Sequence, residues 1–400
     1  MPAATPLPRS PSILTLYNAE DLLIAPGCPV CNYAAEASDR YLTWIALEGH
    51  AEMGTITRLC AGLGACAEHT RRLAGQPGSA IRLTAMYRYI VIAARDRLTG
   101  RAPRLVACLV CEHDSAAAGR ALETLLEGLR ESVVRDRYRD LGGLCLPHLN
   151  TATAIAGHRD IAWLASTTDQ KITLGRSPDW LAGIDPDAEN RAALRRTLPT
   201  TGALLPLACP SCLAGAQAER DALQRLPGLA GDLSGLPGIL CAGHLVDAAA
   251  TASPRALRAL LAWQAHCMAS RMRTESGHRI LRRLRRGVPG SHCLVCRARL
   301  GAAQRTLSAL RGDAQAHRTS LRLCVRHLLA LRARDQRSGR ALSHPAVERA
   351  DQLIAELTYE FERITQARSR SAPFPDIRVW PRAAAFIDGS VFGGTPPSEP

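Results

Sequence analysis

Hydrophobic residues recur with the period of an α-helix in several parts of the chain. Between residues 30 and 50 they form one apolar face, made of Tyr33, Ala37, Tyr41, Trp44 and Ile45. The segment 79–98 has the same character over twenty residues. Faces of this kind usually pack into a protein core. The pattern therefore predicts one helix after residue 30 and a longer packing helix at 79–98.

The same pattern returns further along the chain. A stripe of Ala117, Ala121, Leu125 and Leu126 predicts one helix, and residues 129–141 predict a second helix that runs back and stops at two glycines. Residues 254–286 predict a long helix. A closing helix is predicted at 341–369, with Val347, Leu353, Ile354, Leu357 and Phe361 facing inward. The expected fold class is all-α.

Three segments lack a clear helical period. Residues 1–25 begin with several prolines, and residues 371–400 contain several prolines and glycines, so both predict flexible ends. Residues 175–208 combine two turn clusters with one short helical stretch and predict a linker between two halves of the chain.

A cysteine pattern is superimposed on this helical organisation. A Cys-x-x-Cys pair is followed by a Cys-x-x-His pair four times, with 34, 33, 28 and 27 residues between the inner cysteines. Twelve of the 14 cysteines belong to it. In chain order the sets are Cys28, Cys31, Cys66 and His69; Cys108, Cys111, Cys145 and His148; Cys209, Cys212, Cys241 and His244; and Cys293, Cys296, Cys324 and His327.

Three thiolates and one imidazole are the ligands of a closed tetrahedral zinc site, and a two-residue spacer lets both members of a pair reach one ion. Because protein atoms would fill all four positions, the expected role of the four zinc ions is structural. Two pairs about thirty residues apart share an ion only if the intervening chain doubles back, so we expect tandem helical-hairpin repeats, each closed by its own Cys3His zinc site.

These sets divide the chain into zinc repeats at 26–100, 101–174, 209–290 and 291–370. Cys60 and Cys267 fit no set and are expected to be buried apolar side chains. His113 and His292 lie beside ligand pairs and are alternative ligands. The ligand pairs are expected at helix starts, where the helix dipole stabilises thiolates.

Other interpretations of the cysteines remain open. A disulfide framework belongs to secreted proteins, but the first 25 residues lack the pattern of a signal peptide, so we expect a reducing, cytoplasmic location. A thioredoxin-like pair would follow a β-strand, and none is predicted before the four pairs. Three thiolates and a histidine also suit an iron–sulfur cluster. A zinc-thiolate redox sensor is a further alternative.

Charge is unevenly distributed. The formal net charge is +14, and residues 271–340 hold 18 arginines against Glu275, Asp313 and Asp335. Arg279, Arg282, Arg283 and Arg286 recur at helical spacing and predict a basic helix face. This face is a candidate nucleic-acid-binding surface, and a solvated face in an arginine-biased bacterial genome is the alternative. Protein and nucleic acid are both candidate partners of the 271–340 region.

The closing segments GACAEH, GLCLPH, ILCAGH and RLCVRH, with the Cys-x-x-Cys pairs, resemble a bacterial family of unknown function. Its members carry a CPxC pair followed, after two helices, by a GFCxxH-like segment. The resemblance covers about three quarters of the chain, but the glycine is kept only in the first two copies and the phenylalanine in none. It implies a metal-binding fold without an established activity.

The sequence contains no phosphate-binding loop, nucleophile elbow or HExxH motif, and no apolar run of membrane-spanning length. No small-molecule substrate is evident. We therefore expect a non-enzymatic, cytoplasmic zinc-binding helical repeat protein that acts as a binding scaffold.

Overall fold

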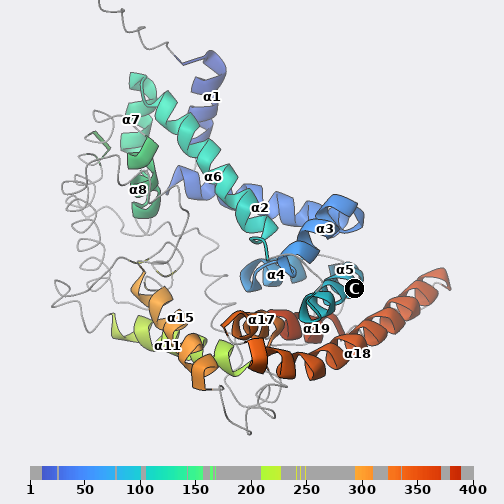
Figure 1. Ribbon diagram of the computed structural model, residues 1–400. Coiled ribbons are helices and arrows are strands. Elements are labelled where there is room, and N and C mark those ends of the chain that lie inside the picture. Colours follow the sequence, from blue (N-terminus) through green and yellow to red (C-terminus); the bar gives the residue numbers. More distant parts are fainter. Residues whose placement is uncertain are drawn as a thin grey trace, which may run out of the picture. The chain divides into compact units, whose positions relative to one another are not determined.

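The computed structural model describes residues 11–24, 27–76, 79–100, 105–141, 143–155, 209–226, 293–309, 323–334, 336–370 and 379–388, with residues 163, 164, 167, 240, 244 and 248. Every regular element among them is a helix (Figure 1). The predicted all-α class is confirmed for this part of the chain. Among the described helices, none combines the length and the apolar character that crossing a lipid bilayer requires.

The described helices of the first half of the chain differ in length. They are α1 (Ile13–Leu22), α2 (Pro29–Leu47), a 3-10 turn η1 (Gly49–Ala51), α3 (Met53–Gly62), α4 (Ala67–Ala74), α5 (Ser79–Leu98), α6 (Leu109–Gly128), α7 (Ser132–Leu141) and α8 (Leu146–Ile155). The helix predicted at 79–98 is α5, with the same bounds, and the predicted out-and-back pair is α6 and α7.

The described helices of the second half are α11 (Pro210–Arg225), α15 (Leu294–Ala309), α17 (Val325–Arg334), α18 (Gln336–Ser369) and α19 (Val379–Asp388). The predicted closing helix is the C-terminal part of α18, where Leu353 and Leu357 are buried. The predicted linker and the long helix at 254–286 lie outside the described residues.

The first cysteine of each described ligand pair stands immediately before a helix. Its carbonyl accepts the hydrogen bond that begins the helix, as between Asn32 N–H and Cys28 O at 3.0 Å and between Thr70 N–H and Cys66 O at 2.8 Å. The same bond occurs at Cys108, Cys145, Cys209, Cys293 and Cys324. The expected position of the ligand pairs at helix starts is therefore confirmed for these seven pairs.

The chain divides into two compact units, and each takes segments from both halves of the sequence. Unit 1 comprises residues 1–37, 115–192 and 220–297, and unit 2 comprises 38–114, 193–219 and 298–400. This division differs from the four consecutive zinc repeats suggested by the sequence.

The core of unit 2 joins helices from both halves of the chain. Helix α5 packs along α18 and also contacts α19 and α17. Trp380, Phe386 and Ile387 of α19 are buried in this core. The prediction of a loose tail at 371–400 is therefore wrong for residues 379–388, because their apolar face covers the core formed by α5, α17 and α18.

In unit 1, helix α1 packs against α7. Ala19 is fully buried, and a Cβ added at Gly128 would come within 2.3 Å of its side chain, so this contact requires a glycine. The prediction of a flexible end at 1–25 is thus wrong for residues 13–22. The segment is short, but Ser12 caps it by accepting a hydrogen bond from Thr15 N–H.

Candidate metal centres

Four groups of cysteine and histidine side chains could hold a metal ion, and within each group the ligand atoms lie within 4.8 Å of one another. We name them sites A to D. Site A is Cys28, Cys31, Cys145 and His148; site B is Cys66, His69, Cys108 and Cys111; site C is Cys209, Cys212, Cys324 and His327; site D is His244, Cys293 and Cys296. Cys241, the predicted fourth ligand near His244, lies outside the described residues.

The groups combine the pairs differently from the prediction. Each Cys-x-x-Cys was expected to share an ion with the next Cys-x-x-His, and this pairing is wrong. In each half of the chain the first pair joins the fourth and the second joins the third, so that one site is nested inside the other. Sites A and D belong to unit 1, and sites B and C belong to unit 2.

Helix lengths explain the nesting in the first half. Helix α2 has 19 residues and extends about 28 Å from Pro29, whereas α3 has 10 residues and returns only about 15 Å. The lengths of α6 and α7, 20 and 10 residues, repeat this mismatch. The predicted hairpin needs two arms of similar length. Because the second arm is half as long as the first, the closing pair does not return to its own opening pair.

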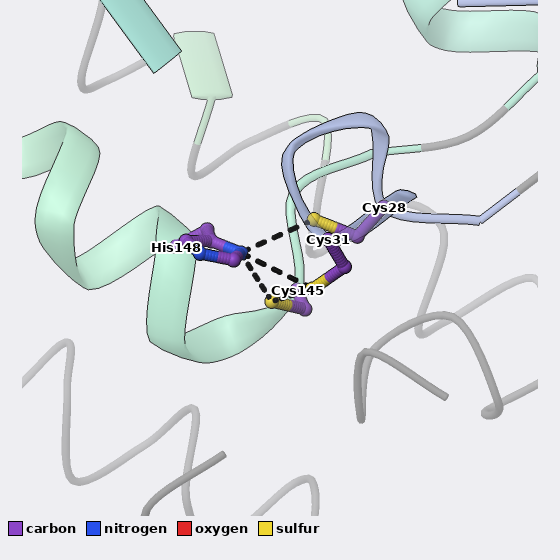
Figure 2. Close-up of side chains that lie close together, drawn as sticks. All are labelled: Cys28, Cys31, Cys145 and His148. Atoms are coloured by element: carbon purple, nitrogen blue, oxygen red, sulfur yellow. Dashed lines mark hydrogen bonds between the residues drawn. The ribbon is translucent and has the colours of Figure 1, made fainter. Parts of the chain in front are cut away.

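Figure 2 shows site A, where Cys28 and Cys31 lie at the start of α2 and Cys145 and His148 lie at the start of α8. His148 Nδ1 lies 3.5 Å from Cys28 Sγ and 3.2 Å from the sulfurs of both Cys31 and Cys145. The sulfurs of Cys31 and Cys145 are 3.6 Å apart. Tyr138, which is fully buried, accepts a hydrogen bond from Leu144 N–H at 2.8 Å and fixes the residue directly before Cys145.

Site B has the same arrangement with an additional carboxylate. His69 Nδ1 lies 3.3, 3.6 and 3.4 Å from the sulfurs of Cys66, Cys108 and Cys111. Its Nε2 faces the Asp114 carboxylate at 3.0 Å. A carboxylate in this position fixes the tautomer that leaves Nδ1 free for a metal and raises the basicity of the imidazole. Asp114 was not identified from the sequence, although it follows the ligand pair by only three residues.

Sites C and D repeat the sulfur-to-nitrogen distances. His327 Nδ1 lies 3.4, 3.3 and 3.2 Å from the sulfurs of Cys209, Cys212 and Cys324. At site D, His244 Nδ1 lies 3.4 Å from Cys293 Sγ and 3.3 Å from Cys296 Sγ.

These distances suit one tetrahedral ion at each site. Zinc bonds of about 2.3 Å to sulfur and about 2.0 Å to nitrogen imply separations of about 3.8 Å between sulfurs and about 3.5 Å between sulfur and nitrogen. One sulfur pair at each of sites A, B and C, namely Cys31–Cys145, Cys66–Cys111 and Cys212–Cys324, is 3.6, 3.8 and 3.8 Å apart. The donor set is therefore placed as a tetrahedral thiophilic cation requires.

The electrostatics of the groups also favour a cation. Burial raises the pKa of Cys145 well above its usual value, and the neighbouring sulfurs of Cys28 and Cys31 raise it further. At site B, burial alone lowers the pKa of His69, but hydrogen bonds with Asp114, Cys108 and Cys66 raise it to about 11. Three adjacent thiolates need a positive charge beside them. Without metal, protons supply that charge, and a divalent ion would replace them.

The remaining cysteines and histidines do not complete these groups. Cys60 is half-buried against the core of unit 2, which agrees with the expected apolar role, and burial raises its pKa to about 11 despite the opposing effect of Arg97. His113 stacks on Tyr41 with ring centroids 4.2 Å apart and belongs to no described metal group. Cys267, His292 and the predicted basic face of Arg279, Arg282, Arg283 and Arg286 lie outside the described residues.

Comparison with protein-family models, with curated proteins and with solved structures found no match. The resemblance to a bacterial family of unknown function therefore stays a prediction. What this chain itself shows is a helical protein with four Cys/His groups that could hold metal ions.

Proposed function

We propose that sites A to D each hold a structural zinc ion and that the protein is a non-enzymatic, zinc-stabilised binding scaffold. The observation that carries the proposal is the convergence of three sulfurs and one imidazole nitrogen at each of sites A, B and C. Such a set fills all the positions of a tetrahedral ion, so no position remains for water or substrate. Cys241 completes site D in this proposal.

A structural zinc site contributes about 10 to 16 kcal/mol of apparent binding free energy at neutral pH. The stability of a whole domain is roughly 5 to 15 kcal/mol. Removal of the ions is therefore expected to unfold the units rather than to loosen them slightly.

Elemental analysis and native mass spectrometry of the purified protein test this directly. We expect four zinc ions per chain and a loss of helical circular dichroism when a strong chelator removes them. A metal-free protein that stays helical and compact would contradict the proposal. Brown material containing iron would favour the iron–sulfur alternative, and stoichiometric zinc release at low peroxide would favour a redox sensor.

The proposed partner is an anionic macromolecule, with nucleic acid as the first candidate. This part rests on the excess of arginine between residues 271 and 340. Phosphate contacts by arginine give sequence-independent affinity that falls steeply with salt. Binding of the full chain to random-sequence duplex should therefore weaken as salt increases.

The matched variants replace four arginines each with glutamine. The test variant changes Arg279, Arg282, Arg283 and Arg286, and the control changes the exposed Arg120, Arg130, Arg368 and Arg370. If the predicted face binds duplex, the slope of log affinity against log salt falls by about 3 to 4 in the test variant only. Equal slopes in the two variants, or no binding at low salt, would remove nucleic acid as the partner of this face.

A further inference from the structure

Arg326 joins two of the candidate metal centres within unit 2. It lies between the site C ligands Cys324 and His327, in the first turn of α17. Its Nη2 donates toward the carbonyl oxygens of Gly62, Leu63 and Ala65, each at 3.2 Å. These carbonyls belong to the turn that ends α3 and leads directly into Cys66, a ligand of site B.

The turn that Arg326 contacts has a strained backbone conformation, and hydrogen bonds within the turn fix it. Gly64 N–H donates to Leu59 O at 2.7 Å and Leu63 N–H donates to Cys60 O at 3.2 Å, as in a helix-terminating Schellman motif. Leu63 has φ 53° and is fully buried, although a left-handed conformation is unfavourable for a residue with a side chain. Such a conformation persists only where its surroundings hold it.

Arg326 contributes to that support, because it donates to the carbonyls of Gly62 and Leu63, which the end of α3 leaves without helical partners. The preceding carbonyl, Ala61 O, accepts from Arg97 Nη2 at 2.8 Å and from Val106 N–H at 3.2 Å. The turn is thus held by groups from three other segments of unit 2.

The conformation of this turn bears directly on site B. Cys66 contributes its sulfur to the site, and its backbone N–H donates to Cys108 Sγ at 3.3 Å. A shift of the turn would therefore change the position of one ligand and remove a hydrogen bond from another. Asp114 contacts a ligand of site B only. Arg326 stands between two ligands of site C in the sequence and contacts the turn that precedes a ligand of site B.

We propose that metal binding at sites B and C is positively coupled through Arg326. An ion at site C fixes Cys324 and His327 in the first turn of α17, which places the intervening guanidinium on the carbonyls of residues 62–65. The ordered turn then presents Cys66 to site B. Linkage requires that an ion at site B favour binding at site C to the same extent. The proposal rests on the metal-binding function proposed above.

The test measures each site separately in the full chain. Zinc-loaded protein is titrated with a chelator, and alkylation of each cysteine is followed by peptide mass spectrometry. Protection of Cys66, Cys108 and Cys111 reports site B, protection of Cys209, Cys212 and Cys324 reports site C, and protection of Cys28, Cys31 and Cys145 reports site A. In the native protein, sites B and C should lose protection together.

Arg326→Gln keeps every ligand but removes the bridge. We expect the chelator concentration that opens site B to fall by about fivefold or more, the lower end of typical coupling, while site A is unchanged.

Arg332→Gln is the matched control. Arg332 also lies on α17, and its Nη1 donates to Arg97 O and Leu98 O at the end of α5, at 3.2 and 2.5 Å, so its loss weakens α17 packing without touching the turn before Cys66. An unchanged site B midpoint in Arg326→Gln, or an equal fall in Arg332→Gln, would overturn the coupling. Cysteines that are alkylated at once in zinc-treated native protein would instead refute metal binding itself.

Discussion

The nested combination of ligand pairs makes a prediction that the consecutive combination contradicts. Cys28 shares site A with Cys145, 117 positions further along the chain (Figure 2), whereas the nearer Cys66 belongs to site B. Cys28→Ser should therefore release the ion of site A and expose Cys31 and Cys145. The sulfurs of Cys66, Cys108 and Cys111 should stay protected.

The expected effect is large. The lost ligand belongs to a site whose ion is worth about 10 to 16 kcal/mol, comparable with the stability of a domain. Local unfolding around site A in unit 1 is therefore expected. Sites B and C should remain closed, because all of their ligands belong to unit 2.

Double variants convert the same reasoning into an ion count. Cys28→Ser with Cys145→Ser removes two ligands of one site, so native mass spectrometry should show one zinc fewer per chain. Cys28→Ser with Cys66→Ser damages two sites and should cost two. The consecutive pairing gives the opposite counts, and observing them would refute the nested arrangement. Cys60→Ser, which alters a thiol outside the four groups, should retain every ion.

Other predictions concern single side chains. Asp114→Asn should weaken zinc binding at site B by about 10- to 100-fold, or about 1.4 to 2.7 kcal/mol, in site-resolved chelator titrations, whereas the exposed Asp140→Asn should not. Trp380→Ala, which empties a buried position in α19, should lower the unfolding free energy by about 3 to 5 kcal/mol in denaturant titrations, and Tyr359→Ala, 65% exposed, by less than about 0.5 kcal/mol. Burial raises the pKa of Cys60 to about 11, so its alkylation at pH 8 should be about 100-fold slower than that of an ordinary thiol and should accelerate up to pH 11. Because the pKa of Cys60 is higher in the folded than in the unfolded protein, the stability gained by burying its neutral thiol is complete below about pH 9 and is lost between pH 9 and 11. An alkylation rate of Cys60 that does not change with pH would contradict the raised pKa.

The helices could be predicted from the sequence because their signals are local. Helix α5 has the predicted bounds, since its apolar period runs uninterrupted from Ser79 to Leu98. The ends of the chain were harder to predict. Helix α19 has only 10 residues, and it owes its place to the burial of Trp380 and its neighbours against helices encoded elsewhere. Trp380, Ala383, Ala384 and Ile387 do recur at helical spacing, but a 10-residue segment is too short to form a stable helix without the rest of the core.

The ligand residue types could also be predicted, because cysteines and histidines that recur in pairs at a two-residue spacing are typical of metal ligands. Which pairs share an ion could not be predicted from spacing. The consecutive pairs of the first half are separated by 34 and 33 residues, and the pairs that meet at site B by 38. Distances along the chain that are so similar do not discriminate between partners. Asp114 was missed for a related reason, since an acidic residue near a ligand pair shows its role only once His69 is placed beside it.

Chain entropy gives only weak guidance about which pairs meet. Joining Cys31 to Cys145 encloses 113 residues instead of the 34 that separate Cys31 from Cys66, and the longer loop costs only about 1 kcal/mol more to close. That difference is small beside the free energy of a structural zinc site. Nesting reduces it further, because closure of site B removes residues 70–107 from the path that site A must span. The decisive factor is therefore geometric: a 10-residue helix does not retrace a 19-residue one, and the ligands meet where the helix lengths allow.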